Sequence, residues 1–335
     1  MLAAILSLAE PTLGAAEARL FRDADPAGYI LFGRNIEHRE QLKALTDSLR
    51  NLHGRDDLAI LIDQEGGRVA RLRPPIWPAF PANEAFDRLY RLAPASAIQA
   101  ARWNARAIAL TLVEVGITVD CLPMLDVRQP GASEIVGDRA LGNEPMQVSA
   151  LGRAQLEGLA SGGVVGVVKH IPGHGRALVD SHKELPFVDA SDEELAIDLE
   201  PFERLADAAM GMTSHIVYRA WDTEFPASQS PTIIRHIIRG RIGFDGFLMS
   251  DDIGMEALYG DIAIRAAACI SAGCDVALHC SGVFEESVRI AQAVASLSDK
   301  AEARLARAMA ARVTDGAGTS LAEAIDTRDQ LLALA

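Results

Sequence analysis

The feature that most constrains the fold is a regular alternation between short apolar runs and longer helical stretches. Amphipathic segments rich in Ala, Leu, Glu and Arg separate most of the apolar runs. Strands that alternate with helices predict βαβ units and a parallel sheet. Eight runs have strand character, since aliphatic and β-branched residues dominate them: Leu2–Leu8, Tyr29–Phe32, Leu58–Ile62, Val119–Leu125, Val164–Val168, Met210–Thr213, Gly246–Met249 and Asp275–Leu278. The helical stretches include 39–51, 95–115, 147–159, 192–208 and 263–272.

Eight strands in 335 residues fit one (β/α)8 TIM-type barrel, whose usual size is about 250 residues with additions. We therefore expect a single domain over residues 1–335. Its helical tail, from about 300 to 335, would have a glycine break near 315–318 and pack on the outside of the barrel. A doubly wound open sheet is the competing fold. No Gly-x-Gly-x-x-Gly turn follows an early strand, which argues against the dinucleotide-binding version of that sheet.

Polar residues follow five of the predicted strands, at the end where TIM barrels carry their active sites. The runs ending at 62, 125, 168, 213 and 249 are followed by Asp63, Asp126, Lys169 with His170, Ser214 with His215, and Ser250 with Asp251 and Asp252. A polar residue at one strand end is common, but five together predict a site. Because consecutive strand residues point to opposite sides, we expect only one of the adjacent pair Asp251 and Asp252 to face a substrate.

The loop after the fifth run is the most crowded in ionisable groups. Lys169-His-Ile-Pro-Gly-His-Gly175 is followed closely by Asp180-Ser-His182. In such an Asp-x-His spacing the carboxylate can orient the imidazole and hold a proton on it, as an acid/base requires. His174, between two glycines, is expected to brace the loop.

Two chemistries fit these residues equally well at this point. A metal-dependent hydrolase would need several histidines and carboxylates converging on one ion. A glycosidase would need a carboxylate to stabilise or trap an oxocarbenium-like centre, and a proton donor for the leaving oxygen. Asp251 could be that carboxylate and His182 the donor.

A resemblance to a known family favours the glycosidase. Four segments occur in order: Asp63-Gln-Glu-Gly-Gly-Arg-Val-Ala-Arg71, Lys169-His-Ile-Pro-Gly-His-Gly175, Asp180-Ser-His-Lys-Glu-Leu-Pro186 and Ser250-Asp-Asp-Ile-Gly-Met255. Together they resemble the β-N-acetylglucosaminidases of glycoside hydrolase family 3, single-domain bacterial enzymes of peptidoglycan recycling. Ile171, Thr213-Ser214 and Ile253-Gly254 depart from the family's usual residues, which affects packing near the site rather than the chemistry.

The resemblance implies a role for each matching residue. Asp251 would be the nucleophile, His182 the acid/base and Asp180 its partner. Asp63, Arg71, Arg139, Lys169 and His170 would bind the sugar. The implied reaction is retaining removal of non-reducing terminal N-acetylglucosamine from peptidoglycan fragments, with neither a metal nor another cofactor. A phosphorylase on the same scaffold and a non-catalytic sugar-binding protein are the alternatives.

Composition sets the expected partners and location. A formal net charge of −14 argues against nucleic acid, whose phosphates require a basic surface. No apolar run approaches the ~20 residues of a membrane span, and the apolar N-terminus lacks the basic residues of a signal peptide. The four cysteines fit no zinc pattern and are expected to be buried thiols in a reducing cytoplasm. We expect a cytoplasmic monomer that binds a small carbohydrate, with no nucleic-acid or membrane partner.

Overall fold

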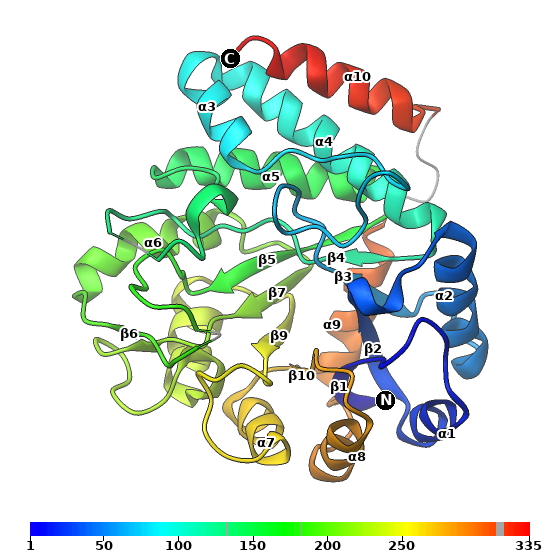
Figure 1. Cartoon of the computed structure of the whole chain (residues 1–335). Helices are drawn as coiled ribbons and strands as arrows, with labels where there is room; N and C mark the ends of the chain where they lie inside the picture. Colours follow the sequence, from blue (N-terminus) through cyan, green and yellow to red (C-terminus); the bar gives the residue numbers. More distant parts are fainter. Residues whose placement is uncertain (132, 182, 313–317) are drawn as a thin grey trace.

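Eight parallel strands close into a barrel in the computed structural model of this chain, which describes residues 1–131, 133–181, 183–312 and 318–335. The order around the barrel is β1-β10-β9-β7-β5-β4-β3-β2 (Figure 1). The strands are β1 (Leu2–Ser7), β2 (Pro26–Leu31), β3 (Ala59–Ile62), β4 (Val119–Asp120), β5 (Val165–Ile171), β7 (Met210–Thr213), β9 (Phe247–Asp252) and β10 (Val276–Leu278). Each overlaps one of the eight predicted runs, so the predicted TIM-type barrel is confirmed.

Helices surround the barrel and connect its strands (Figure 1). They are α1 (Ala15–Ala24), α2 (Arg39–His53), α3 (Glu84–Leu92), α4 (Pro94–Glu114), α5 (Pro145–Ser161), α6 (Asp192–Arg204), α7 (Ile262–Ala272), α8 (Phe284–Ala293), α9 (Asp299–Ala310) and α10 (Leu321–Leu332). A π-type helix, Ile233–Arg241, replaces an α-helix between β7 and β9, and β6 (Phe187–Val188) pairs with β8 (Val217–Tyr218) outside the barrel. The five predicted helical stretches correspond to α2, α4, α5, α6 and α7.

Local capping explains where several of these helices begin and end. The side chain of Ser191 accepts a hydrogen bond from the Glu194 N–H, and Glu194 bonds back to the Ser191 N–H, which starts α6. Asp261 caps the start of α7, because its side chain accepts a hydrogen bond from the Ala263 N–H. Gly273 ends α7 at a φ of 118°, in the left-handed region where a glycine is favoured.

Strand β4 is shorter than predicted because Pro123 interrupts its ladder. Proline has no N–H to donate, so regular pairing stops after Asp120. The chain still follows β5, since the Lys169 N–H donates to the Pro123 carbonyl over 3.1 Å and the Leu125 N–H donates to the Lys169 carbonyl over 2.7 Å. The predicted run to Leu125 is therefore extended along β5 without being a regular strand.

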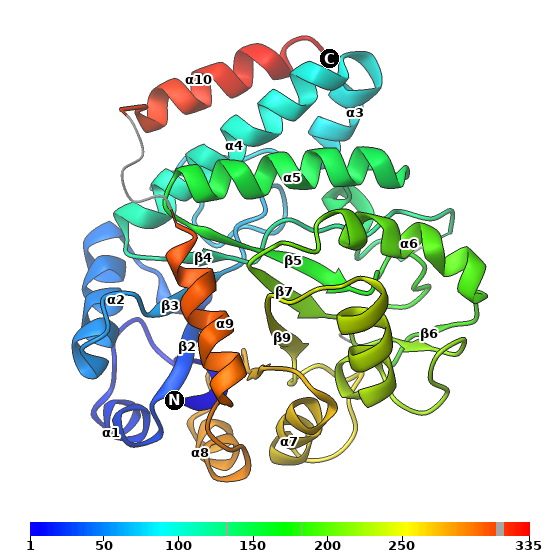
Figure 2. The same ribbon diagram turned by 180° about the vertical axis from the view of Figure 1, so that it is seen from behind.

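Helix α9 covers the N-terminal end of the barrel. Four of its side chains, Ala301, Leu305, Ala308 and Met309, pack with the inward-facing residues of the strands. Figure 2 shows this helix in front of the strands when the molecule is seen from behind. The inward-facing residues are Ala3, Ile5, Ala27, Ile30, Ala59, Leu61, Val119, Cys121, Val165, Val167, Met210, Met212, Phe247, Met249, Val276 and Leu278.

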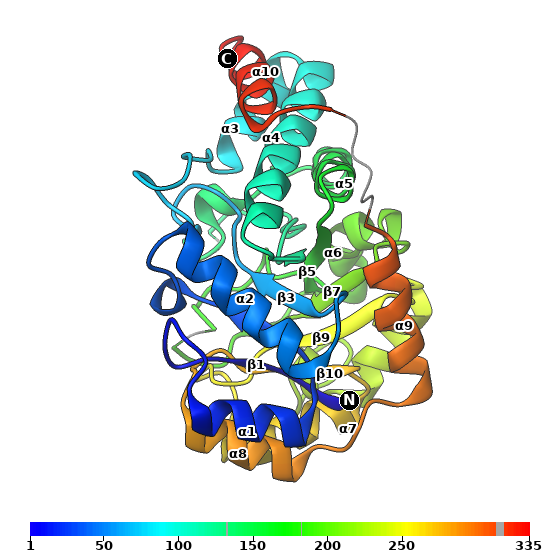
Figure 3. The ribbon, with the colours of Figure 1, turned by 90° about the vertical axis from the view of Figure 1, so that its right-hand side faces the viewer.

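The two helices of the tail have different positions. Helix α10 packs outside the barrel on α3 and α4 (Figure 3). There, Arg328 donates to the Asn104 Oδ1 over 3.2 Å. The prediction that the tail packs outside is thus right for α10 and wrong for α9, whose apolar face fills the barrel end. Most of the predicted glycine break lies outside the described residues. None of the helices in the described part combines the length and apolarity needed to cross a membrane.

Candidate active site

Six of the predicted site residues line one pocket of about 240 Å³ at the C-terminal ends of the strands. They are Asp63, Arg71, Arg139, Lys169, His170 and Asp251. Apolar side chains, including those of Phe32, Met212 and Leu278, complete the wall. Pockets for drug-sized ligands usually measure about 300–1,000 Å³, so this one suits a ligand of roughly one sugar ring.

Strand alternation explains why the first charged residues point inward. In β3, Ala59 and Leu61 face the barrel interior, and the same period of two places Asp63 on that side. In β5, Val165 and Val167 face inward and are followed in the same way by Lys169. Along each of these strands, the barrel interior therefore changes from apolar to charged between one inward-facing residue and the next.

Irregular pairing turns two further side chains toward the pocket. The β5–β7 register shifts between Val168 and Ile171, and His170 faces the pocket together with Lys169. The β9–β10 register shifts near Leu278, and Asp252 lines the pocket beside Asp251. The expectation that only one of the two aspartates faces the pocket is wrong, because local ladder irregularities can re-aim a side chain.

A chain of ion pairs crosses the floor of the pocket. Lys169 Nζ lies 2.6 Å from Glu65 Oε1 and 3.2 Å from Asp63 Oδ1. Arg71 Nη2 donates to Asp63 Oδ2 over 3.0 Å. Arg139 grips Glu65 with two hydrogen bonds of 2.8 and 2.9 Å, a geometry that strengthens a guanidinium–carboxylate pair.

These contacts keep the floor of the pocket ionised. Burial alone would raise the pKa of Asp63, but Lys169 and Arg71 outweigh it and hold that pKa below its usual value. Burial would likewise raise the pKa of Glu65, which Arg139 and Lys169 hold well below its usual range. The pKa of Lys169 is raised in spite of burial, because Glu65 and Asp63 stabilise the ammonium. The floor thus presents fixed charges that can bind sugar hydroxyls.

Asp126 lies behind the pocket and orients two histidines. Its Oδ2 lies 2.7 Å from His170 Nδ1, and its Oδ1 accepts the backbone N–H groups of His170 and His174 over 3.2 and 2.6 Å. Burial would raise the pKa of Asp126, yet His170 draws it below the usual value. With Nδ1 turned to this carboxylate, His170 has its other ring nitrogen available to a ligand.

His174 connects this group to the loop that carries the predicted acid/base. Its Nε2 lies 3.2 Å from Ser181 Oγ, and burial, together with His170, lowers its pKa to about 4. The expected bracing role of His174 is in keeping with these contacts. Ser181 and Asp251 both line a cavity of about 20 Å³ behind the pocket. Asp180 is half-buried and does not line the pocket, and His182 lies outside the described residues.

Asp252 is held by the backbone around it. Its Oδ1 accepts the N–H of Gly254 over 3.0 Å and that of Cys280 over 3.1 Å. Burial and the adjacent Asp251 raise its pKa, although the Gly254 N–H opposes this. Cys280 lines the pocket and is only partly buried, unlike Cys121, Cys269 and Cys274, which are buried free thiols as expected.

His215, expected at the strand ends as a further candidate, is not among the residues that line the pocket. It is buried, with Nδ1 2.7 Å from Ser228 Oγ and Nε2 3.0 Å from the Asp252 carbonyl. Both ring nitrogens are therefore used within the protein. Within the described ranges, no three His, Cys, Asp or Glu side chains are placed to share a metal ion.

Glu65 is the main pocket residue absent from the predicted set. It is 2% exposed and is shared by Lys169 and Arg139. A signal was present, because Glu65 lies only two residues after Asp63, just beyond the end of β3. Its role was not visible in the sequence, since both cations come from distant parts of the chain.

Comparisons with known proteins agree with this geometry. Residues 6–315 match the glycosyl hydrolase family 3 N-terminal domain. A beta-hexosaminidase from Bordetella avium is 38% identical over 260 residues, covering 76% of this chain and 73% of that protein. The crystal structure of native NagZ from Neisseria gonorrhoeae is 31% identical with a TM-score of 0.87, covering 98% of this chain and 97% of that one. The same protein in complex with N-trifluoroacetyl-D-glucosamine is similar, at 29% identity and a TM-score of 0.86, covering 99% of this chain and 97% of that one.

Proposed function

This chain belongs to glycosyl hydrolase family 3 as a β-N-acetylhexosaminidase, and we propose that it removes non-reducing terminal N-acetylglucosamine from peptidoglycan fragments. The substrates would be N-acetylglucosaminyl-anhydro-N-acetylmuramic acid and its peptides. The observation that carries the proposal is the convergence of six residues on one sugar-sized pocket. The free buried thiols support a reducing compartment, the cytoplasm, for this activity.

The floor of the pocket supports the binding roles. Asp63 and Glu65 are ionised acceptors, and Arg71, Arg139 and Lys169 are donors whose partners hold them in place. Hydrogen bonds to ionised groups are roughly twice as strong as neutral ones. Sugar hydroxyls can donate to the carboxylates and accept from the cations, so the ring would be fixed above Asp251.

In the first step Asp251 attacks the anomeric carbon. A bond forms between a carboxylate oxygen and this carbon while the bond to the leaving oxygen breaks, and protonated His182 gives its proton to that oxygen. The product is a glycosyl ester of Asp251. Asp251 extends inward from β9 into the pocket, which supports this role.

In the second step water resolves the ester. Neutral His182 takes a proton from the water, whose oxygen bonds to the anomeric carbon as the ester bond breaks. Two displacements at one carbon retain the β configuration. Ser181, next to His182 in the sequence, shares a small cavity with Asp251, which supports His182 as the partner in both steps.

A histidine suits both halves of this cycle. With an ordinary pKa of ~6.5, it donates and accepts a proton near neutral pH without a raised carboxyl pKa. Most retaining enzymes use a second carboxyl group about 5 Å from the nucleophile. Asp180, two residues before His182, would hold the imidazole in one tautomer and favour its charged form.

The test is release of 4-nitrophenol from its N-acetyl-β-glucosaminide, and of N-acetylglucosamine from the anhydro-disaccharide, with and without phosphate. We expect turnover of both substrates that does not depend on phosphate. We also expect the variants Asp251→Ala and His182→Gln to lose this turnover, while their Tm stays close to that of the wild type.

Other outcomes would select another function. Sugar 1-phosphate formed only with phosphate would indicate a phosphorylase. Binding without turnover would indicate a sugar-binding protein, and equal turnover by Asp251→Ala would refute the assigned nucleophile.

A further inference from the structure

A buried asparagine behind the candidate active-site pocket connects Arg139 to helix α5. Asn83 is 1% exposed and directly precedes α3. Its Nδ2 donates to the backbone carbonyl of Arg139 over 2.8 Å, and its Oδ1 accepts from Nε2 of Gln155 over 2.8 Å. Gln155 is itself fully buried on α5. Asn83 is not among the residues that line the pocket, so it can affect a ligand there only through its neighbours.

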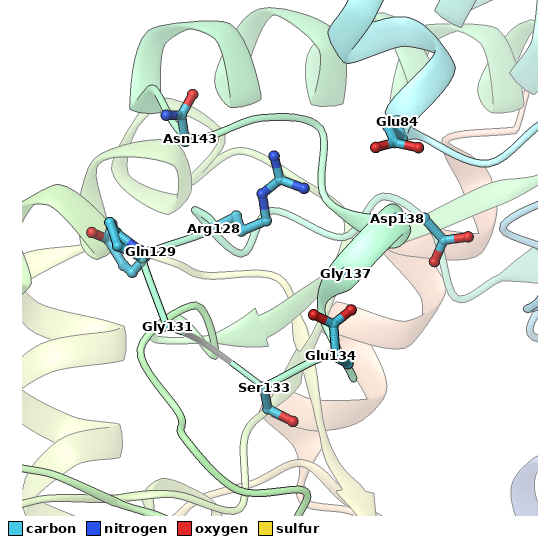
Figure 4. Close-up of a pocket in the computed structure, with 10 residues that line it drawn as sticks. Glu84, Arg128, Gln129, Gly131, Ser133, Glu134, Gly137, Asp138 and Asn143 are labelled. Atoms are coloured by element: carbon cyan, nitrogen blue, oxygen red, sulfur yellow. The ribbon is translucent and has the colours of Figure 1, made fainter.

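The bond from Asn83 holds the backbone of a residue whose side chain lines the pocket. Arg139 ends the 3-10 turn Gly137–Arg139. This turn lies beside the start of α3, because Asp138 and Glu84 line one further pocket, of about 550 Å³ (Figure 4). A carbonyl that is held at the end of the turn limits how the Arg139 backbone can move, and therefore where its guanidinium lies.

The segment before α3 also packs on the loop that carries Glu65, the ion-pair partner of Arg139. Gly66 follows Glu65 and has a φ of 101°, in the left-handed region that favours glycine. A Cβ at Gly66 would come within 2.2 Å of the carbonyl oxygen of Pro81, two residues before Asn83. Residues 81–83 therefore contact the backbone next to each member of this ion pair.

We propose that Asn83 is a positioning residue for the reaction. It sets where Arg139 and, through their ion pair, Glu65 lie in the pocket, and thereby how tightly the sugar ring is bound. The inference rests on the proposed function, because the placement of Arg139 affects activity only if this pocket binds N-acetylglucosamine. It extends the binding machinery to a side chain that does not touch the ligand.

The chemistry of the contact explains why an amide is suited to this position. An amide carries a donor and an acceptor on one planar group. The Arg139 carbonyl can only accept, so Nδ2 of Asn83 must face it, and Oδ1 is then turned to the Gln155 amide. An aliphatic side chain at position 83 would take a partner from both groups, and a buried polar group that loses its partner is costly. The turn that carries Arg139 would then shift toward another donor.

The test compares Asn83→Ala with a matched control, Thr46→Ala. The buried Thr46 side chain also donates to a backbone carbonyl, that of Val115 over 2.8 Å, but it lies on α2, outside the pocket. Both variants should have a lower Tm. Only Asn83→Ala should raise the KM for the 4-nitrophenyl glycoside, by about fivefold to twentyfold, with kcat within about threefold of wild type. Inhibition by N-acetylglucosamine, which reports binding without turnover, should weaken by the same factor.

A second variant, Gln155→Leu, keeps the donation to Arg139 but removes the bond that orients the Asn83 amide. We expect it to raise KM by about threefold, less than Asn83→Ala does. If Asn83→Ala leaves KM as unchanged as Thr46→Ala does, the inference is overturned. If Asn83→Ala does not fold, Gln155→Leu decides, and a wild-type KM in that variant would overturn the inference in the same way. Failure of the proposed function is a separate result, namely wild-type enzyme that releases no 4-nitrophenol.

Discussion

The two ends of the barrel interior differ in what fills them. At the N-terminal end, α9 inserts Leu305 and Met309 among the first inward-facing residues of the strands. At the C-terminal end, the same strands present Asp63, Lys169 and Asp251 to a pocket. Apolar side chains exclude water from the N-terminal end. The C-terminal end instead holds buried charges that face a pocket.

This difference separates stability from chemistry along each strand. Burying an apolar side chain such as Leu305 favours the folded state by about 1.5–3 kcal/mol. Burying a charge is unfavourable unless its partners remain, so Lys169 depends on Glu65 and Asp63. Substitutions at the apolar end should change mainly stability, and those at the charged end should change activity as well.

The largest combined effect is expected from Glu65→Gln at the charged end. The amide keeps the shape but leaves Lys169 and Arg139 without the charge they share, which should lower stability by about 3 kcal/mol. Because both cations line the pocket, kcat/KM should fall more than about 100-fold. Urea unfolding and 4-nitrophenol release measure the two losses.

A control for that variant is Glu157→Gln on α5. Glu157 pairs with Arg102 at an exposed site, so its change should cost less than about 1 kcal/mol and leave kcat/KM unchanged. If Glu65→Gln were as mild as this control, the ion-pair network would not organise the pocket.

At the apolar end, Leu305→Ala should lower the free energy of unfolding by about 2–5 kcal/mol, because the packed end leaves a cavity. The kcat/KM of folded enzyme at low temperature should stay within about twofold. Leu334→Ala, at a residue 58% exposed, serves as the control. A large loss of kcat/KM with unchanged stability would contradict the proposed division between the two ends.

A smaller effect is expected from Asp252→Asn. The amide oxygen can still accept from Gly254 and Cys280, so we expect kcat/KM to fall by no more than about 10-fold. Asp251→Asn should instead lose nearly all turnover. Steady-state kinetics of the two variants, side by side, decide which carboxylate is the nucleophile, and complete loss in Asp252→Asn alone would reverse the assignment.

The smallest effect concerns the pH dependence of stability. Folding lowers the pKa of Glu65. Its ionised carboxylate therefore contributes to the free energy of unfolding above its unfolded pKa of ~4.3, and this contribution is lost as pH falls below that value. The stability gap between wild type and Glu65→Gln should therefore narrow in acid. The pKa of Asp252 is raised, so Asp252→Asn should gain stability relative to wild type as pH rises above ~3.9. Urea unfolding at several pH values checks both expectations. Stability differences from wild type that do not change with pH would contradict them.

Much of the fold could be predicted because its signals are local. Each barrel strand lies within or across a predicted apolar run, and capping residues such as Ser191 mark helix starts. The position of α9 could not be predicted, since an apolar helix face can cover either the outside or the end of a barrel. The irregular end of β4 depends on how Pro123 faces β5, which is a tertiary property.

The positions of Asp63 and Lys169 at the pocket could be predicted, because each directly follows an apolar run. The predicted site was incomplete where geometry departs from the period of a strand, because the register shifts that turn Asp252 toward the pocket leave no trace in the sequence. Glu65 was missed for another reason: its partners Lys169 and Arg139 are 104 and 74 residues away in the chain.

The position of α9 also has a consequence for biosynthesis. This helix follows all eight strands in the chain, so it leaves the ribosome after the residues that line the pocket. Until then the interior of a nascent barrel has no lid at its N-terminal end, and its apolar lining is exposed to water and to other chains. Growing chains arrested before Asp299 should therefore be the form of this protein that most needs chaperones.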